Sequence, residues 1–182
     1  EKTKVMIVNE EDSARLIQDR MKLLGITEKS EDIFYRISNG SKLQKDFIED
    51  LIIETKEKDI RVVIFDSLRS VHRSNENDST EMQEVMDLLK TVARAGLTVI
   101  FTHHHRKKSM FSKGDDAEAS RGSSAINAAI SGHISMEEEV RGEDIYLAVR
   151  HLKSKAGEKL PPFEIKIVKS KDRISLAYSG EY

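Results

Sequence analysis

Acidic and histidine side chains follow three apolar stretches of this sequence, and their types suit metal-assisted hydrolysis of a nucleotide. Glu10, Glu11 and Asp12 follow the first stretch, Asp66 ends the second, and His103, His104 and His105 follow the third. Mg²⁺ prefers one or two carboxylates together with water and phosphate oxygens, and the attacking water needs a base or an orienting group. An apolar strand followed by an acid is also common in ordinary loops, so this pattern alone leaves both interpretations open.

Alternating strand and helix patterns place these side chains at one edge of a predicted sheet. Apolar runs predict strands at 4–9, 33–37, 61–66 and 97–102, and helical periodicity predicts helices at 11–24, 43–58 and 80–95. This order is typical of a parallel, doubly wound sheet, and four consecutive apolar residues at 62–65 suit a strand covered on both faces. Ligands bind beyond the carboxyl ends of such strands, so we expect the acids and histidines to converge there.

The sequence changes character after residue 102. Residues 103–120 are polar and lack an apolar period, which predicts a long loop. A short helix is expected at 125–130, and strands joined by turns are expected at 144–151, 163–168 and 173–178. The predicted fold class is therefore α/β, with a parallel central sheet and an antiparallel C-terminal extension, in a single domain over residues 1–182.

Composition excludes several classes of protein. The chain has 182 residues, no cysteine, and 30 basic against 32 acidic residues, for a net charge of −2. Without cysteine there is no disulfide scaffold, thiol catalysis or Cys-ligated metal site, and a near-neutral chain binds nucleic acid only through a local patch. No apolar run approaches the length of a membrane span, and no secretory signal opens the chain. We expect a cytoplasmic protein with no membrane partner.

Four sequence motifs occur in order along the chain. They are Val5–Ser13 (VMIVNEEDS), Val62–Arg69 (VVIFDSLR) followed by Glu76-Asn77-Asp78, Val99–Lys107 (VIFTHHHRK), and Arg121–Ala125 (RGSSA). Together they resemble the strand ending in Glu-Asp, the Walker B strand, the His-His-x-x-Lys motif and the Arg-Gly-Ser-Ser element of plasmid RepA-type replicative helicases. Those are RecA-like hexameric ATPases of the AAA/P-loop NTPase class. The resemblance covers roughly residues 4–168 and implies a RecA-like three-layer fold.

The resemblance implies catalytic roles for side chains at the strand ends. Glu11 would be the general base that polarises the attacking water, with Glu10 the alternative if the alignment shifts by one residue. Adjacent side chains on an extended strand point to opposite faces, so only one of the two can serve. Asp66 would hold Mg²⁺, through a water molecule, and His104 or His103 would sense the γ-phosphate of ATP.

Two lysines match a further motif of related hexameric helicases. Lys153 and Lys155 lie where those proteins carry a Lys-x-Arg pair that reaches the nucleotide of the neighbouring subunit. The resemblance therefore implies nucleotide binding by both. The second position here is Lys, which supplies a point charge without the bidentate fork of Arg.

The loop at 103–120 is the expected contact with single-stranded DNA. The residues that the resemblance implies for this role are Arg106, Lys107, Lys108, Lys113 and Arg121. Phosphate contacts of this kind give salt-dependent, sequence-independent binding. The alternative is a solvated loop whose basic residues are nearly neutralised by the acids at 115, 116 and 118.

No Gly-x-x-x-x-Gly-Lys-[Ser/Thr] phosphate loop occurs anywhere in these 182 residues. In the family this loop precedes the strand predicted at 4–9, and losing its strand would expose the edges of two neighbours. We therefore expect the sequence to begin inside the domain, and we expect this chain alone to hydrolyse ATP poorly.

The function implied is that of an ATP-dependent DNA helicase of RepA type that acts in replication. ATP and Mg²⁺ would bind at the interfaces of a homo-oligomeric ring, expected to be a hexamer, with single-stranded DNA in its channel. One alternative is a RecA/RadA-like recombination or regulatory ATPase. Another is a non-catalytic oligomerisation module that has lost the phosphate loop.

Overall fold

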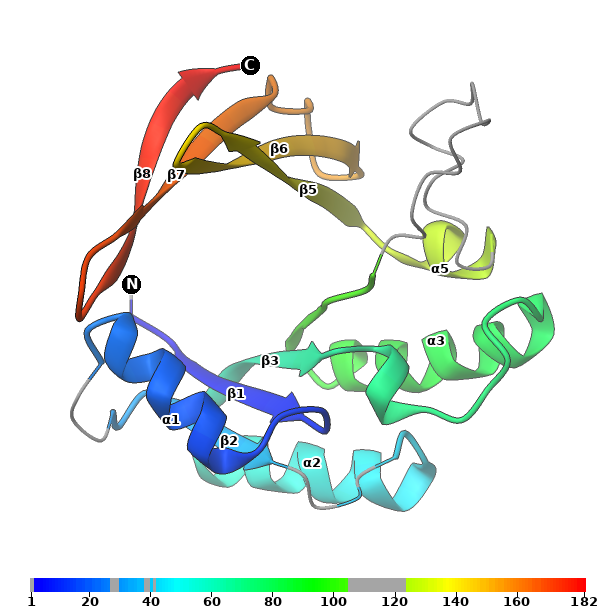
Figure 1. Cartoon of the computed structure of the whole chain (residues 1–182). Coiled ribbons are helices and arrows are strands. Elements are labelled where there is room, and N and C mark those ends of the chain that lie inside the picture. Colours follow the sequence, from blue (N-terminus) through cyan, green and yellow to red (C-terminus); the bar gives the residue numbers. More distant parts are fainter. Residues whose placement is uncertain (1, 27–29, 38–39, 41, 105–123) are drawn as a thin grey trace. The chain divides into compact units, whose positions relative to one another are not determined.

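Two sheets of four strands each organise the chain in the computed structural model (Figure 1). The structure describes residues 2–26, 30–37, 40, 42–104 and 124–182. The chain divides into two compact units, one formed by Glu1–Ile17 with Glu28–Ala129 and the other by Gln18–Thr27 with Ile130–Tyr182. The first unit contains the parallel sheet and the second contains the antiparallel sheet.

The parallel sheet has the order β2-β1-β3-β4. Its strands are β1 (Lys4–Asn9), β2 (Ile33–Ile37), β3 (Ile60–Asp66) and β4 (Thr98–Phe101). The helices are α1 (Ala14–Leu23), α2 (Lys45–Glu57), α3 (Ser79–Arg94) and α5 (Ser124–Ala129), and a short 3₁₀ turn, η1, covers Arg69–Val71. All three strand pairs are parallel, which confirms the predicted α/β fold class. Among the described residues, no helix is both long and apolar enough to cross a membrane.

The core of the first unit lies between the sheet and two helices. Met6 and Val8 of β1 are in register with Val63 and Phe65 of β3, and all four side chains are fully buried. Helices α2 and α3 contact each other and pack on β3 and β4 respectively. The buried side chains that they contribute are Ile48, Leu51, Met82, Val85, Met86 and Leu89.

The opposite face of the parallel sheet is less covered than the apolar run at 62–65 predicts. Val62 and Ile64 of β3 are only half-buried, and Ile100 of β4 is 47% exposed. Successive side chains of a strand point to opposite faces. A continuous apolar run therefore shows that both faces are apolar, and it does not establish that both are covered to the same degree.

The antiparallel sheet of the second unit connects its strands in sequence order. Its strands are β5 (Gly132–Arg141), β6 (Asp144–Ser154), β7 (Phe163–Lys169) and β8 (Ile174–Glu181). Three of these were predicted, and β5 was missed. Its alternating apolar residues Ile134, Met136 and Val140 are interrupted by the acidic run 137–139, which hides the period of two that identifies a strand.

Ion pairs connect the strands on one face of the antiparallel sheet. Arg141 of β5 pairs with Glu164 of β7 and with Glu139. Lys166 pairs with Asp144 at 2.6 Å. Strand register places these groups on the same face, and cross-strand pairs of opposite charge stabilise a sheet. Met136, Ile145, Leu147, Val149, Ile165 and Ile167 lie on the other face.

The N-terminus of α3 provides a test of local stability. Asp78 is the residue before the helix, and its Oδ1 accepts hydrogen bonds from the backbone N–H groups of Thr80 and Glu81 at 2.8 and 3.1 Å. Asp78→Ala leaves these donors without their cap and should lower the free energy of unfolding by about 1 kcal/mol. Urea denaturation followed by circular dichroism measures the change. Asp78→Ser keeps a capping oxygen and should lose much less; an equal loss for both variants would contradict the capping role.

Candidate active site

The carboxyl ends of three parallel strands meet at Asp66. This residue ends β3, and its carboxylate accepts hydrogen bonds from the two neighbouring strands. The Nδ2 of Asn9, at the end of β1, donates to Oδ2 at 3.1 Å. The Oγ1 of Thr102, which follows β4, donates to Oδ1 at 2.8 Å. Asp66 is therefore held from both sides, and its two oxygens have fixed directions.

Asn9 organises the turn that carries the acidic residues. Its side chain is buried, and its Oδ1 accepts hydrogen bonds from the backbone N–H groups of Glu11 and Asp12 at 3.0 and 2.8 Å. Its Nδ2 also lies 3.4 Å from an oxygen of Asp12. Sequence reasoning assigned no role to Asn9. The available signal was an amide residue at the end of an apolar strand, directly before a run of acids, a position where an Asx-type turn is favoured.

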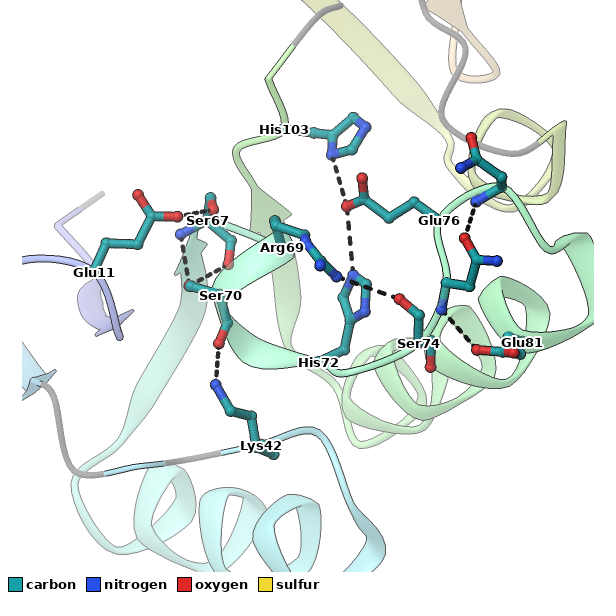
Figure 2. Close-up of polar contacts among 12 residues, drawn as sticks. Glu11, Lys42, Ser67, Arg69, Ser70, His72, Ser74, Glu76, Glu81 and His103 are labelled. Carbon is teal, nitrogen blue, oxygen red and sulfur yellow. Dashed lines mark hydrogen bonds and ion pairs between the residues drawn. The ribbon is translucent and has the colours of Figure 1, made fainter.

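The two candidate bases point to different neighbours. The hydroxyl of Ser67, the residue after Asp66, donates a hydrogen bond to Oε1 of Glu11 (Figure 2). Oε2 of Glu10 instead accepts from the backbone N–H of Gly40, beyond the end of β2, at 3.0 Å. The structure thus places Glu11, and not Glu10, beside Ser67 and the end of β3.

The segment after Asp66 is closed by its own hydrogen bonds. The peptide bond between Asp66 and Ser67 is cis. Ser70 Oγ accepts from the Ser67 N–H at 3.2 Å and donates to the Ser67 carbonyl at 2.7 Å. Leu68 N–H donates to the Thr102 carbonyl at 2.9 Å, and the ammonium of Lys42 donates to the Ser70 carbonyl. The Leu68 contact ties the segment to the residue after β4, and the Lys42 contact ties it to the residues before α2.

A second group of titratable side chains lies farther along the same segment. We name His72, Glu76 and His103 the Glu76 triad (Figure 2). Glu76 Oε1 lies 3.6 Å from His72 Nε2 and 3.9 Å from His103 Nδ1. Burial lowers the pKa of His72, with Arg69 and His103 acting in the same direction, whereas the charge of Glu76 opposes the shift. Sequence reasoning identified His103, quoted Glu76 only as part of a motif, and interpreted His72 as a surface or packing residue; the structure buries His72.

The remaining predicted residues are distributed as follows. His104 is exposed, whereas His103 is half-buried against Glu76. Lys153 lies in β6 and Lys155 directly follows that strand, with its N–H bonded to the Ser131 carbonyl at 2.8 Å; both belong to the second unit. The residues predicted to bind DNA (Arg106, Lys107, Lys108, Lys113 and Arg121) lie outside the described part of the chain.

The side chains around Asp66 suit a magnesium ion better than a metal that is bound by three or more protein ligands. Each Asp66 oxygen accepts one hydrogen bond and retains a second lone pair. Within the described ranges, no group of three or more His, Cys, Asp or Glu side chains is arranged to hold a metal. Mg²⁺ commonly binds through one or two carboxylates and keeps several waters, so a single fixed carboxylate beside a polar turn fits that ion.

The chain matches the sequence model of a known protein family. A sequence model of the family described as an AAA domain matches residues 1–110 of the 182. The matched part contains β1 to β4, and with them Asn9, Glu11, Asp66 and the Glu76 triad.

The buried amide of Asn9 can be tested with a nearly isosteric change. Asn9→Asp replaces the Nδ2 donor with a carboxylate oxygen that faces Asp66 and Asp12, so one hydrogen bond is replaced by repulsion between acids. We expect the free energy of unfolding at neutral pH to fall by about 2 kcal/mol or more, measured by urea denaturation. Gln18→Glu makes the same change of charge at an exposed position of α1 and serves as the control. An Asn9→Asp protein as stable as this control would contradict the bridging role.

Proposed function

Because the chain belongs to the AAA domain family of P-loop ATPases, we propose that the carboxyl ends of β1, β3 and β4 form its site of ATP hydrolysis. One observation carries this proposal. The hydroxyl of Ser67, the residue after Asp66, donates a hydrogen bond to the carboxylate of Glu11. A proton-accepting group and a candidate metal-binding group therefore lie at one edge of the sheet. Hydrolysis with Mg²⁺ needs both groups in one place.

Each residue at this edge has a distinct role in the proposal. Glu11 accepts the proton of the attacking water, and its carboxylate is oriented by the Ser67 hydroxyl. Asp66 would hold Mg²⁺, with its oxygens directed by Asn9 and Thr102. When bound, Mg²⁺ neutralises charge on the phosphate oxygens.

The wider activity that we propose is that of a RepA-type replicative helicase. The motifs at Val5–Ser13, Val62–Arg69, Val99–Lys107 and Arg121–Ala125 support it because they occur in the order found in that family. Subunits would form a ring, a hexamer in our proposal, with ATP at the subunit interfaces and single-stranded DNA in the channel. Two further sets of residues take part, namely Lys153 and Lys155 at the nucleotide of the adjacent subunit, and Arg106, Lys107, Lys108, Lys113 and Arg121 at the DNA.

The neighbouring glutamates offer a matched test of the base. Glu11→Gln keeps the shape of the side chain and removes its proton affinity, so turnover should fall about 100-fold or more while ATP binding remains measurable. Glu10→Gln makes the same change at the carboxylate directed at Gly40 and should retain most activity. Turnover is measured as phosphate release by the unsubstituted protein and by both variants. Loss of turnover in Glu10→Gln with retention in Glu11→Gln would refute the assignment.

DNA binding by residues 106–113 has its own test. Lys107→Ala combined with Lys108→Ala should weaken binding of single-stranded DNA and should reduce the dependence of log K on log salt by about one unit or more. Lys169→Ala combined with Lys171→Ala removes the same charge from exposed positions at the end of β7 and in the turn that follows it and controls for net charge. Fluorescence anisotropy over a range of salt concentrations measures both pairs. Equal losses in the two proteins would remove this segment from the DNA site.

A further inference from the structure

Strand β8 forms one edge of the antiparallel sheet (Figure 1). It pairs with β7 on one side, and no strand of the described residues pairs with it on the other side. An unpaired edge presents a row of backbone N–H and C=O groups to which another strand can be added. The edge of β8 is therefore a candidate contact surface, and it lies outside the proposed site of ATP hydrolysis.

The two edges of this sheet differ in their protection against strand addition. Natural edge strands are commonly protected by charged side chains or by proline. The opposite edge, β5, carries the acidic run 137–139 and ends at Arg141. In β8 the only charged residue is Glu181, the last one of the strand, and the strand contains no proline. Charge therefore protects the edge of β5 and leaves the edge of β8 available for pairing.

The turn before β8 shows which of its backbone groups point away from β7. The Ser170 N–H donates to the Arg173 carbonyl at 2.8 Å, so these two residues form a hydrogen-bonded pair. Hydrogen-bonded and non-hydrogen-bonded pairs alternate along an antiparallel ladder, and the register next to this turn is regular as far as residue 178. The residues whose N–H and C=O groups point outward from the sheet are consequently Ile174, Leu176 and Tyr178.

The side chains of the same three residues make one face of the edge apolar. Leu176 is 59% and Tyr178 is 69% exposed, and Ile174 is half-buried. The residues between them, Ser175 and Ala177, are small and point to the opposite face. A strand added at this edge would cover the apolar side chains through cross-strand contacts, which removes apolar surface from water.

This edge is complementary to a second copy of itself. Antiparallel pairing about a two-fold axis at Leu176 places that residue opposite its own counterpart and Ile174 opposite Tyr178, so apolar side chains meet on one face. Lys171, in the turn before β8, and Glu181 each lie five residues from Leu176, on opposite sides of it. The same axis therefore brings the ammonium of each copy to the end that carries the carboxylate of the other, and opposite charges across strands stabilise a sheet.

We propose that β8 pairs antiparallel with β8 of a second copy of this chain, with the two-fold axis at Leu176. The two antiparallel sheets then form one continuous sheet in a dimer. A two-fold contact closes on itself, so this dimer is separate from the ring proposed above and does not depend on ATP hydrolysis. One pair of strands gives a smaller contact than the roughly 1,200 Å² at which stable interfaces begin, so the dimer dissociates on dilution.

Proline at the axis tests the backbone contact. Sedimentation equilibrium of the 182-residue chain should show monomers and dimers whose ratio changes with concentration. Leu176→Pro removes the outward N–H of both copies and takes no donor from the ladder with β7, so it is tolerated at an edge, and the dissociation constant should rise about tenfold or more.

Met136→Pro is the matched control for this substitution. Met136 is 60% exposed on the edge strand β5. The same alternation, counted from the two-residue turn at 142–143, points its N–H away from β6. This variant should leave the dissociation constant unchanged.

A disulfide cross-link tests the register without proline. The chain has no cysteine, so an introduced thiol can react only with its counterpart in another copy. Opposed hydrogen-bonded residues have Cα atoms about 5.5 Å apart, within the range of a disulfide, so Leu176→Cys should form a covalent dimer in oxidised glutathione. Ser175→Cys is also exposed, but it lies opposite Ala177 of the second copy and should cross-link much more slowly. Non-reducing gel electrophoresis measures both rates.

Three results would overturn the proposal. The first is an unsubstituted chain that stays monomeric up to about 1 mM. The second is association that folded Leu176→Pro leaves unchanged, because another surface then carries it, whether in dimers or in larger assemblies. The third is equal cross-linking of Leu176→Cys and Ser175→Cys, because the contact then has no fixed register. If Leu176→Pro does not fold, the cross-linking rates decide.

Discussion

The hydrogen bonds to the Asp66 carboxylate are the contacts on which the candidate site depends. Asn9 and Thr102 donate to its two oxygens from the strands on either side, and hydrogen bonds to a charged group contribute about 1.5 to 3 kcal/mol each. Because β1, β3 and β4 are parallel neighbours, their carboxyl ends lie at one edge. The residues just after these strands therefore start from the edge that carries Asp66, and the local turn decides which of their side chains lie near it.

Asn9 also explains why adjacent glutamates have different surroundings. Its Oδ1 accepts the N–H groups of both Glu11 and Asp12, so the chain turns immediately after β1 instead of continuing as a strand. Glu11 then meets Ser67 beside β3, whereas Glu10 meets Gly40 beyond β2. The prediction that alternation along a strand separates the two side chains does not apply here, because β1 ends at Asn9 and both glutamates lie in the turn that follows. Only the turn determines which of them reaches the edge near Asp66.

The parallel sheet was predictable because each of its strands is a short apolar run that can be recognised from the local sequence. Strands β1 and β2 have the predicted bounds. Strand β5 was not predicted, since its acidic run masks the alternation. Within the site, Asp66 and the acidic run at 10–12 were identified from residue type and position, whereas the choice of Glu11 came from the family resemblance. The hydrogen bonds that orient these carboxylates were not predicted, because they join distant residues; Asn9 and Asp66, for example, are 57 residues apart. A tertiary contact of this kind leaves no periodic pattern in the sequence.

The residues at the end of β4 contact both Asp66 and Glu76. Thr102 contacts Asp66, and the next residue, His103, faces Glu76, although both acids belong to β3 or the segment after it. The carbonyl of Thr102 also accepts the N–H of Leu68. A displacement of β4 by the length of one hydrogen bond would therefore alter the surroundings of both carboxylates together. Residues 105–123 follow His104 directly in the chain, so the segment that is hydrogen-bonded to Asp66 through Thr102 continues into the residues proposed to bind DNA.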